Sequence, residues 1–587
     1  MAAGYNPDGV ACVPVRIWRW NVTLHIADIC VLVLYLVIVT VIGFRAAKRI
    51  KTSADFFMPR KFGKVMMLFF AFGSGTHSDQ AVGVASKSFT NGLSGIWYQW
   101  LYLPTTPFYW LIAPVLRRFR AITTADVFEA RFSRSVATLF VVVGIMTLVV
   151  SLALMLRGSS EVISASIGGM VPPRYAMAIM AVLFMGYGFA GGLAAAVLSD
   201  FLQGILTVVF SFLLLPLILN AVGGLDGIRH AVGDRHVLSL VVPGDIGLFY
   251  IAVISFTSLV GIVTQPHILG NCAAGKTEFE GQVGFMGGMI LKRLCTIPWA
   301  LTGVAAIVYF AGRDIRPDQV FGAVAGDFLP KLVPGVLGVF IAAVLASVMS
   351  ACSAFMISSS ALFTENIYRR VLPDKPARHY VLVGRLASIV FVAAGVIFAF
   401  WLPNIVKGLE IFWMTSPVIG IAFWLGLFWR RTTVAGAWAA TLTAAAVWWL
   451  TTQSFFVNFL GGLAANDNMR FVVSKGTGLE ISLPWQMVFY LTAGTLAGII
   501  VSLFTKPVAA EKLDNFYALI RTPVKAGEEI TAPCTLPEGT VVPAKRCIFA
   551  KGGIEILVPS VTSVVGFTIG LFCAVALIGL VFLITKL

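Results

Sequence analysis

Long apolar segments alternate with short polar ones along the whole chain, and this alternation restricts its fold more than any other feature. We count about fourteen segments long enough to cross a bilayer as a helix, which takes roughly 20 apolar residues. The segments are continuous apolar blocks, not the periodic apolar faces of soluble helices. Only 12% of the 587 residues are charged, about half the usual fraction in soluble domains. The sequence therefore predicts an all-α polytopic membrane protein.

The predicted spans are 27–46, 65–92, 94–116, 136–156, 174–197, 200–220, 247–270, 281–312, 333–367, 380–402, 404–428, 434–452, 486–504 and 561–584. Residues 1–26 are largely polar, so we expect an extracellular N-terminal segment and no cleaved signal peptide. The eight cysteines are scattered along the chain, and this spacing favours neither a metal site nor a disulfide framework.

The basic residues indicate how the spans are oriented. The net charge is +16, and much of the excess lies in loops that follow odd-numbered spans, at 44–64, 116–134, 368–378 and 429–433. Lysine and arginine concentrate in cytoplasmic loops, so one orientation satisfies all four loops. We expect both termini outside and a lipid bilayer as the partner of the basic loops, not a nucleic acid.

Two of the predicted spans contain helix-breaking residues. The first, 65–92, carries "FGSGTHSDQAVGVAS" at 72–86, and the second, 247–270, contains Gly261, Pro266 and Gly270. Unwound backbone is tolerated at membrane depth only where protein or a cavity covers it. The broken spans are five spans apart, which is typical of inverted-repeat transporters. Glycine and proline that serve only helix packing are the alternative interpretation.

Five segments then carry a resemblance to a known family. They are "LSGIWY" (93–98), "GGLAAAVLSDFLQG" (191–204), "TQPHILGNCAA" (264–274), "SVMSACSAFMISSSALFTENIYRR" (347–370) and "TSPVIGIAFWLGLFWRRTT" (415–433). In this order they resemble the sodium:solute symporter family. The resemblance implies a LeuT-type fold of two five-helix inverted repeats, with one extra N-terminal helix and three C-terminal helices.

The chain is accordingly divided into seven parts. They are the extracellular segment 1–26, the extra helix 27–46, the first repeat 65–220, the second repeat 247–428, accessory helices 434–504, a cytoplasmic loop 505–558 and the last helix 561–584. The loop 505–558 has short alternating runs and turn residues, and we expect a small β-rich or irregular appendage without catalytic residues.

A column of serines lies inside the predicted span 333–367. Ser347, Ser350 and Ser353 are three residues apart and so share nearly one helix face. Small residues there can serve helix packing, and hydroxyl and carbonyl oxygens can also bind a hard cation. The resemblance favours the cation, because this helix and the first broken helix hold sodium in the family.

The resemblance implies five sodium-binding positions. They are the carbonyl groups of Gly73, Thr76 and Ser347 and the side chains at Ser350 and Ala351.

Two of these regions depart from the family pattern. Ala351 has no hydroxyl where the family has serine or threonine, and Gly75 stands where the family often has aspartate or asparagine. A water, Ser353 or Asp79 can replace the missing oxygen. Alternatively, the coupling ion is a proton, or the carrier is uncoupled.

The expected solute-binding residues lie on four predicted spans. They are Gln80, Thr264, Gln265, Lys292 and Glu410. Gln80 and Lys292 match solute-site positions of the bacterial sugar transporters, and Thr264 and Gln265 lie at the second break. We expect the neighbouring Arg293 to extend to the membrane interface, as long basic side chains do near helix ends.

Ionisable residues inside spans are candidates for ion passage or gating. An ionisable group costs roughly 3 kcal/mol or more at the bilayer centre, which singles out His77 and Asp79 in the first broken helix. Asp200 opens the span 200–220, where the family has an acid on the cytoplasmic exit path of the ion. A structural hydrogen bond for His77 and a helix N-cap for Asp200 are the alternatives.

The sequence thus predicts a secondary active transporter of the bacterial inner membrane, not an enzyme. It is expected to couple the import of a small polar solute (sugar, polyol, amino acid or carboxylate) to sodium by alternating access. A proton-coupled or uncoupled carrier, and a sensor or scaffold on the same fold, are the alternatives. Sodium is then a transported ion, not a fixed cofactor, and no oligomeric state is indicated.

Overall fold

The computed structural model describes residues 24–47, 62–233, 236–464, 471–475, 478–525, 527–528, 530, 532–545, 547–549 and 552–586. Within these, side chains are described except at 39–40, 42–47, 187–202, 350, 377, 463–464 and 474–475.

The described elements of the first part of the chain are all helices. Its elements are α1 (Ile26–Ala47), α3 (Lys64–Gly75), α4 (Ser78–Asn91), η1 (Gly92–Ile96), α5 (Trp97–Trp100), α6 (Thr106–Arg118), α7 (Thr124–Arg131), α8 (Arg134–Ser166), α9 (Pro173–Ala221) and α10 (Gly224–Val232).

The middle part contains the second predicted repeat. Its elements are α11 (Leu248–Ile262), α12 (Ile268–Ala273), α13 (Glu278–Gln282), η2 (Val283–Gly287), α14 (Gly288–Tyr309), η3 (Pro317–Gln319), α15 (Val320–Phe328), η4 (Leu329–Lys331), α16 (Val336–Phe363), η5 (Thr364–Tyr368), α17 (Arg369–Val371), α18 (Ala377–Trp401) and α19 (Ile405–Phe428).

The last part adds two short antiparallel strand pairs, β1–β2 and β3–β4. Its elements are α20 (Val434–Leu450), α21 (Ser454–Ala464), β1 (Val472–Lys475), β2 (Gly478–Ile481), α22 (Leu483–Phe504), α23 (Ala510–Arg521), β3 (Cys547–Phe549), β4 (Ile556–Leu557) and α24 (Val561–Ile584).

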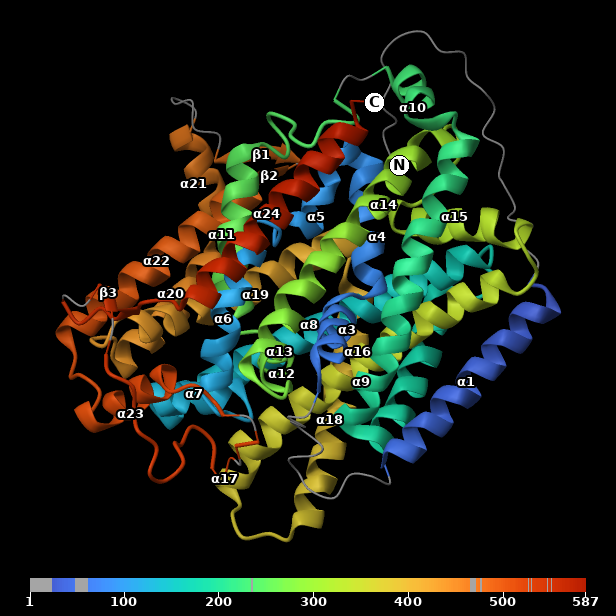
Figure 1. The fold of residues 1–587 in the computed structure, drawn as a ribbon. Coiled ribbons are helices and arrows are strands. Elements are labelled where there is room, and N and C mark those ends of the chain that lie inside the picture. Colours follow the sequence, from blue (N-terminus) through green and yellow to red (C-terminus); the bar gives the residue numbers. More distant parts are fainter. Residues whose placement is uncertain are drawn as a thin grey trace.

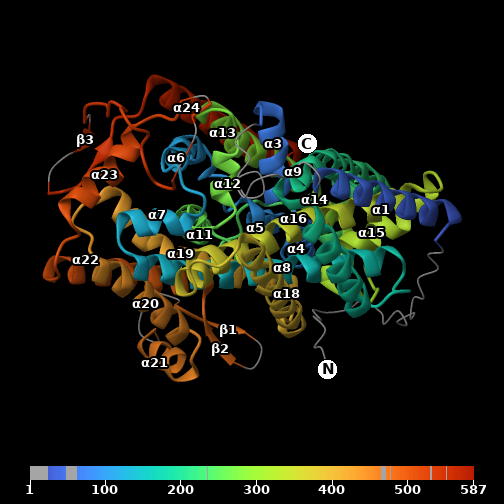
Figure 2. The same ribbon diagram turned by 90° about the horizontal axis from the view of Figure 1, so that it is seen from below.

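The long helices form one bundle with polar segments at its two ends (Figure 1). Helices α10 and α21 and strands β1–β2 lie at one end, and α7, α17 and α23 lie at the other. The described parts of 221–246 and 453–485 are therefore at the end opposite helix α23 of the segment 505–558. Figures 1 and 2 both place α1 at the edge of the bundle away from α22 and α23.

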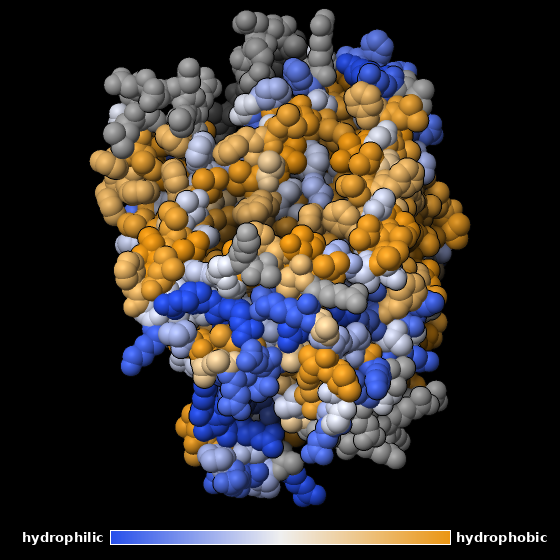
Figure 3. Space-filling view, turned by 60° about the vertical axis from the view of Figure 1, so that its left-hand side comes forward, coloured by the Kyte–Doolittle hydropathy of each residue, from blue (hydrophilic) through white to orange (hydrophobic). Residues whose placement is uncertain are grey.

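Burial separates the inner helices from those that face lipid. In the part of the chain that the structure describes, eight helices are long and apolar enough to cross a membrane, or nine if α20 and α21 count as one bent span. In the most apolar 18-residue stretch of each helix, 88% of the residues are buried in the span that contains α16 and 22% in α24. Figure 3 shows apolar side chains gathered in a broad band on one face, above a strongly hydrophilic region. This band is the surface expected of an integral membrane protein.

One predicted boundary is wrong. The sequence separates spans 174–197 and 200–220, but the backbone of α9 is helical without interruption from Pro173 to Ala221. The connecting segment "GGLAAAVLSDFLQG" contains no proline, so every residue in it can keep its helical hydrogen bond.

The segment 505–558 is more ordered than an irregular appendage, because it contains helix α23. The side chains of Leu513, Phe516, Tyr517 and Ile520 are buried, and their spacing is that of one apolar helix face. Helix α23 packs against α6 and α7. The expectation for this segment missed the helix, although the spacing of these four residues indicates it.

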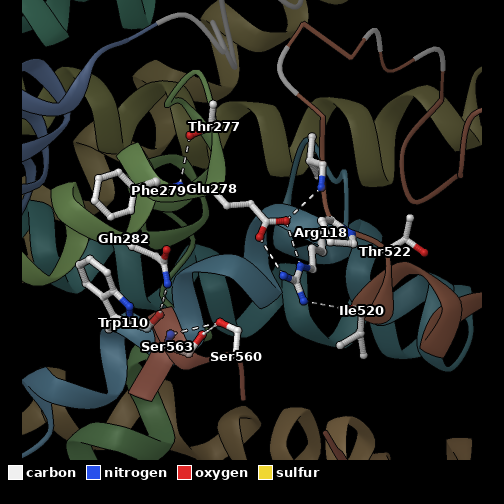
Figure 4. Close-up of polar contacts among 12 residues, drawn as sticks. Trp110, Arg118, Thr277, Glu278, Phe279, Gln282, Ile520, Thr522, Ser560 and Ser563 are labelled. Carbon is white, nitrogen blue, oxygen red and sulfur yellow. Dashed lines mark hydrogen bonds and ion pairs between the residues drawn. The ribbon is translucent and has the colours of Figure 1, made fainter. Parts of the chain in front are cut away.

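Ion pairs hold this segment to the end of the bundle (Figure 4). Arg118 of α6 donates two hydrogen bonds to the carboxylate of Glu278, at 2.9 and 2.8 Å. Glu278 also accepts from the backbone N–H of Val524 at 3.0 Å. Arg120, whose side chain is fully buried, pairs with Glu528 and donates to the carbonyl of Thr522. The segment thus joins the ends of α6 and α13.

The orientation can be tested with two introduced cysteines, Asp226→Cys in α10 and Glu511→Cys in α23. An impermeant maleimide should label the first in intact cells and the second only after permeabilisation, because the two exposed positions lie at opposite ends of the bundle. Peptide mapping distinguishes the new cysteines from the native ones. Labelling of Glu511→Cys in intact cells would overturn the predicted orientation.

The docking of 505–558 is expected to depend on Glu528. Glu528→Gln leaves the buried Arg120 guanidinium without its carboxylate, and a hydrogen bond to a charged group contributes about 1.5–3 kcal/mol. Trypsin cleavage after Lys525 in inside-out vesicles should become roughly 10- to 150-fold faster. Asp514→Asn is the matched control, because the Asp514–Arg430 pair is exposed and worth less than about 1 kcal/mol. Equal cleavage rates would contradict the prediction.

Candidate functional site

The first helix break is confirmed. Helix α3 ends at Gly75, Thr76 and His77 have extended backbone, and α4 begins at Ser78. The backbone N–H of Thr76 donates to the carbonyl of Gly73 at 3.2 Å. The Thr76 hydroxyl is buried and has no hydrogen-bond partner in the described part of the chain.

The second break is also confirmed. Helix α11 ends at Ile262 and α12 begins at Ile268, with non-helical backbone between them. Pro266 lies in this stretch and lacks the N–H that would continue the helix. Thr264 does not face a cavity: its hydroxyl contacts the carbonyls of Gly261 and Ser416, each at 3.0 Å. Gln265 does face the central cavity.

Both breaks contribute to one central cavity, which with its opening encloses about 610 Å³ of empty space. Polar side chains enter it from the first break (His77, Asp79, Gln80), the second break (Gln265, His267), η1–α5 (Gln99) and α14 (Lys292, Arg293). Apolar and aromatic side chains from other helices complete the lining, among them Leu154, Phe355, Leu409, Phe412 and Trp413. A few convergent polar groups in an apolar cavity are typical of small-molecule sites.

The charged groups of the first break face Lys292. Lys292 donates to the carbonyl of Gly75 and is close enough to Asp79 to interact electrostatically. The imidazole of His77 contacts the carbonyl of Ser74 at 3.0 Å and lies 3.7 Å from Asp79. Lys292 therefore stabilises the unwound backbone and offsets the charge of Asp79.

Glu410 lies outside the cavity, in a network that closes one side of it. The Tyr98 hydroxyl donates to Glu410 at 2.8 Å, and Lys407 lies 3.3 Å from the same carboxylate. The Tyr98 ring packs on Trp413, which lines the cavity, with centroids 4.9 Å apart. Glu410 is therefore not among the residues that line the central cavity, and it contacts that lining through Tyr98.

A second cavity lies on the opposite side of the second break. It is lined by Ser74, Thr123, His267, Asn271 and Glu365, among others. His267 lines both cavities, and Thr123 and Glu365 belong to the end of the bundle that carries α7 and α17. The central cavity thus has Tyr98 and Glu410 behind its lining residue Trp413, and it shares His267 with the second cavity.

The expected ion-binding positions lie where α16 packs against α3 and α4. Ser347 and Ala351 are buried, and Ser347 lines a small cavity together with His77 and Ser78. The side chains of Ser350 and Asp200 lie outside the described residues.

Ser353 does not supply the missing oxygen in this structure. Its hydroxyl lies 2.5 Å from the carbonyl of Met349 and 3.4 Å from that of Phe184. The Thr76 hydroxyl and the Asp79 Oδ1 atom are buried and have no hydrogen-bond partner among the described residues.

The family can now be assigned. The sequence profile of the sodium:solute symporter family matches residues 56–444, more than half of the chain. This chain belongs to the sodium:solute symporter family. The family's profile covers both helix breaks, α14 and α16, so it includes every part of the site described above.

Two curated relatives and one solved structure illustrate the similarity. The osmoregulated proline transporter OpuE of Bacillus subtilis (strain 168) is 28% identical over 501 residues, covering 81% of this chain and 94% of the relative. The sodium/glucose cotransporter of Vibrio parahaemolyticus is 26% identical over 457 residues, covering 70% and 83%. A substrate-bound, outward-open sodium-coupled sialic acid symporter matches with a TM-score of 0.64 at 18% identity, covering 83% of this chain and 99% of the symporter. The symporter has the LeuT-type fold that the resemblance implied.

Sequence reasoning missed the role of Arg293. We expected it at the membrane interface, but its side chain is buried and lines the central cavity. Pro298 lies inside α14 and the π-helical segment η2 precedes this helix, and the spacing of apolar residues did not indicate that Arg293 is buried. A basic pair far inside an apolar block is the signal that points to the cavity.

The Tyr98–Glu410 bond predicts a specific effect of Tyr98→Phe. This change removes the hydroxyl that donates to Glu410 and leaves the ring on Trp413, so the closed side should open more often. A cysteine at the cavity-lining Ser151 should react roughly 10-fold or more faster with a small impermeant thiol reagent, since a charged hydrogen bond contributes about 1.5–3 kcal/mol.

Tyr490→Phe is the matched control for this prediction, because the buried Tyr490 hydroxyl has no partner among the described residues. Its reaction rate should equal that of the parent carrying Ser151→Cys. A Tyr98→Phe rate no faster than this control would mean that the Tyr98–Glu410 bond does not hold the cavity closed.

Proposed function

We propose that the chain is a sodium-coupled symporter that imports a small polar organic solute across the bacterial inner membrane, with both termini outside. The observation that carries the proposal is the meeting of both helix breaks at one polar cavity within a sodium:solute symporter fold. In this proposal residues 65–220 and 247–428 are the two repeats, and the cavity is the solute site. Gln80, Gln265 and Lys292 contact the solute, and Glu410 and Tyr98 form the outer gate.

Sodium would bind between the first break and α16. Unwound backbone supplies carbonyl oxygens from Gly73 and Thr76, and α16 supplies Ser347 and Ser350. A hard cation prefers such oxygen ligands, and the unpaired Thr76 hydroxyl compensates for the missing hydroxyl at Ala351. The bound ion would tie α3 and α4 to α16 and so order the solute site beside it.

Coupling follows from this arrangement. If sodium orders the break that also lines the solute cavity, bound sodium raises the affinity for the solute. The bound solute must then raise the affinity for sodium by the same factor. Opening of the Tyr98–Glu410 gate admits the solute. This gate then closes, and the second cavity, near Thr123 and Glu365, opens and releases the solute. Each net charge moved inward gains about 2.3 kcal/mol per 100 mV of membrane potential.

A proton-coupled carrier is the second candidate. His77 and Asp79 lie 3.7 Å apart in the cavity, and ionisable pairs inside membranes serve as proton relays in pumps and transporters. Uptake into proteoliposomes under a sodium gradient, a proton gradient or neither separates the candidates. Acceleration by sodium alone supports the proposal, acceleration by protons alone supports the second candidate, and no uptake of any tested solute favours a sensor or scaffold.

The sodium site predicts opposite effects of two substitutions in α16. Ser350→Ala should raise the sodium concentration for half-maximal thermal stabilisation by about 5- to 150-fold, because an unmade polar contact costs about 1–3 kcal/mol. Ala351→Ser should lower that concentration, because it adds the hydroxyl that the family pattern has. Melting temperatures are measured over a range of sodium chloride concentrations, with potassium chloride as the control salt. This measurement reports both effects without a known solute.

Ser353→Ala is the matched control, because the Ser353 hydroxyl is already bonded within α16. It should leave the sodium titration unchanged. If Ser350→Ala is as silent as Ser353→Ala, the serine column serves packing and the proposed ligand set is wrong.

A further inference from the structure

Arg293 is a buried cation that no acidic side chain neutralises. It is 1% exposed, and in the described part of the chain it forms no ion pair with a carboxylate. Its Nε–H has no hydrogen-bond partner there, and one terminal nitrogen lies 3.4 Å from the amide oxygen of Gln99. The guanidinium lies over the ring of Tyr102, 5.2 Å from its centroid. These neighbours are neutral, so the charge of Arg293 is not offset.

Two other buried arginines of the bundle have closer partners. Arg120 pairs with Glu528, and Arg131 donates to the backbone carbonyls of Gly426 and Trp429 at 2.7 and 2.9 Å. Both lie at the end of the bundle near α23. Lys292, beside Arg293, already has the carbonyl of Gly75 and the charge of Asp79. With Asp79 offset by Lys292, Arg293 leaves the central cavity with one excess positive charge among its described residues.

A buried, unneutralised guanidinium is costly in an apolar interior, and a bound anion would remove that cost. We propose that Arg293, aimed with a free Nε–H into the cavity between the two helix breaks, binds the carboxylate of an anionic organic solute. This inference rests on the proposed symport function and narrows its solute from any small polar molecule to an organic carboxylate.

The chemistry of the cavity fits a carboxylate better than a neutral solute. A guanidinium presents parallel N–H donors that match the two oxygens of a carboxylate. A neutral hydroxyl or amide would take one of these hydrogen bonds and leave the charge unmatched. Gln265 and Gln80, whose Oε1 has no partner in the described part of the chain, can bind polar groups on the rest of the solute. Trp413 and Phe355 cover its apolar surface.

The backbone of Arg293 is held in place, which favours a recognition role. Its carbonyl accepts a hydrogen bond from the indole of the buried Trp100 at 3.0 Å. The side chain therefore starts from a fixed point on α14, and the two tyrosines at its sides, Tyr102 and Tyr109, limit its rotation. A cation that is preorganised in this way needs little ordering when the carboxylate arrives.

The test compares matched acids and neutral analogues on the purified full-length chain in lipid nanodiscs. The pairs are lactate and lactamide, pantothenate and panthenol, and glucuronate and glucose. Melting temperatures are measured for each compound in sodium and in potassium chloride. We expect at least one acid to raise the melting temperature in sodium chloride. The concentration for half-maximal stabilisation should be at least 10-fold higher for its neutral partner.

Arg293→Gln should raise the half-maximal concentration of that acid at least 10-fold and leave the melting temperature of the solute-free protein unchanged or higher. A merely structural arginine predicts the opposite for the solute-free protein, namely a lower melting temperature. Arg293→Lys keeps the positive charge but loses the parallel N–H donors of the guanidinium. It should weaken binding of the acid by less than Arg293→Gln does. Arg174→Gln, at the exposed start of α9, is the matched control and should change neither property.

The outcomes separate this inference from the function on which it rests. Stabilisation by a neutral compound as strong as by its acid, no response to any acid, or an unchanged acid response in Arg293→Gln overturns the carboxylate assignment. Sodium-dependent stabilisation would leave the proposed symport intact in each case. An acid response that depends on Arg293 but is equal in sodium and potassium supports the assignment and argues against sodium coupling.

Discussion

Backbone groups that leave a helix inside a membrane must find new partners, and this requirement organises the structure. At the first break the Gly73 carbonyl accepts from Thr76, the Gly75 carbonyl accepts from Lys292, and the Ser74 carbonyl contacts His77. At the second break Thr264 contacts the carbonyls of Gly261 and Ser416. Each break is thus stabilised by a polar side chain, and these side chains bring together α3, α14 and α19 around the cavity.

The charges of the cavity are arranged as a consequence. Lys292 is used to hold the unwound backbone and to offset Asp79, which leaves Arg293 free for a ligand. Removing ions from water is expensive, so a cavity with one uncompensated cation is less stable empty than filled by an anion. This difference in free energy between empty and filled cavity is what a transporter can use to link solute binding to closure of the gate.

The two ends of the bundle are built differently. At one end Tyr98 bonds to Glu410 and packs on the cavity-lining Trp413, and in the proposed function these contacts form the gate that opens during transport. At the other end α23 buries an apolar face against α6 and α7, and Arg118, Arg120, Glu278 and Glu528 join the loop to the bundle. The more extensive contacts at this end give the second cavity a stable frame on which smaller movements can occur.

The sequence alone determined the membrane-embedded helical fold, both helix breaks and the family, because each depends on local chemistry. Apolar length decides insertion, and glycine and proline decide where a helix can unwind. The sequence also placed Gln80, Gln265 and Lys292 at the cavity. It misplaced Arg293, because whether a residue on a transmembrane helix faces a cavity or lipid depends on how the helices are rotated and packed.

Helix packing also decided the continuity of α9, the formation of α23 and the arrangement of the charges in the cavity. The loop at 198–199 is absent because helical hydrogen bonds continue through it, and α23 forms where its apolar face finds α6 and α7. Lys292 and Arg293 are 213 and 214 positions from Asp79 in the sequence, yet the fold brings Lys292 within electrostatic range of Asp79. Only the tertiary structure brings such groups within range of one another, and electrostatic interactions depend on that distance.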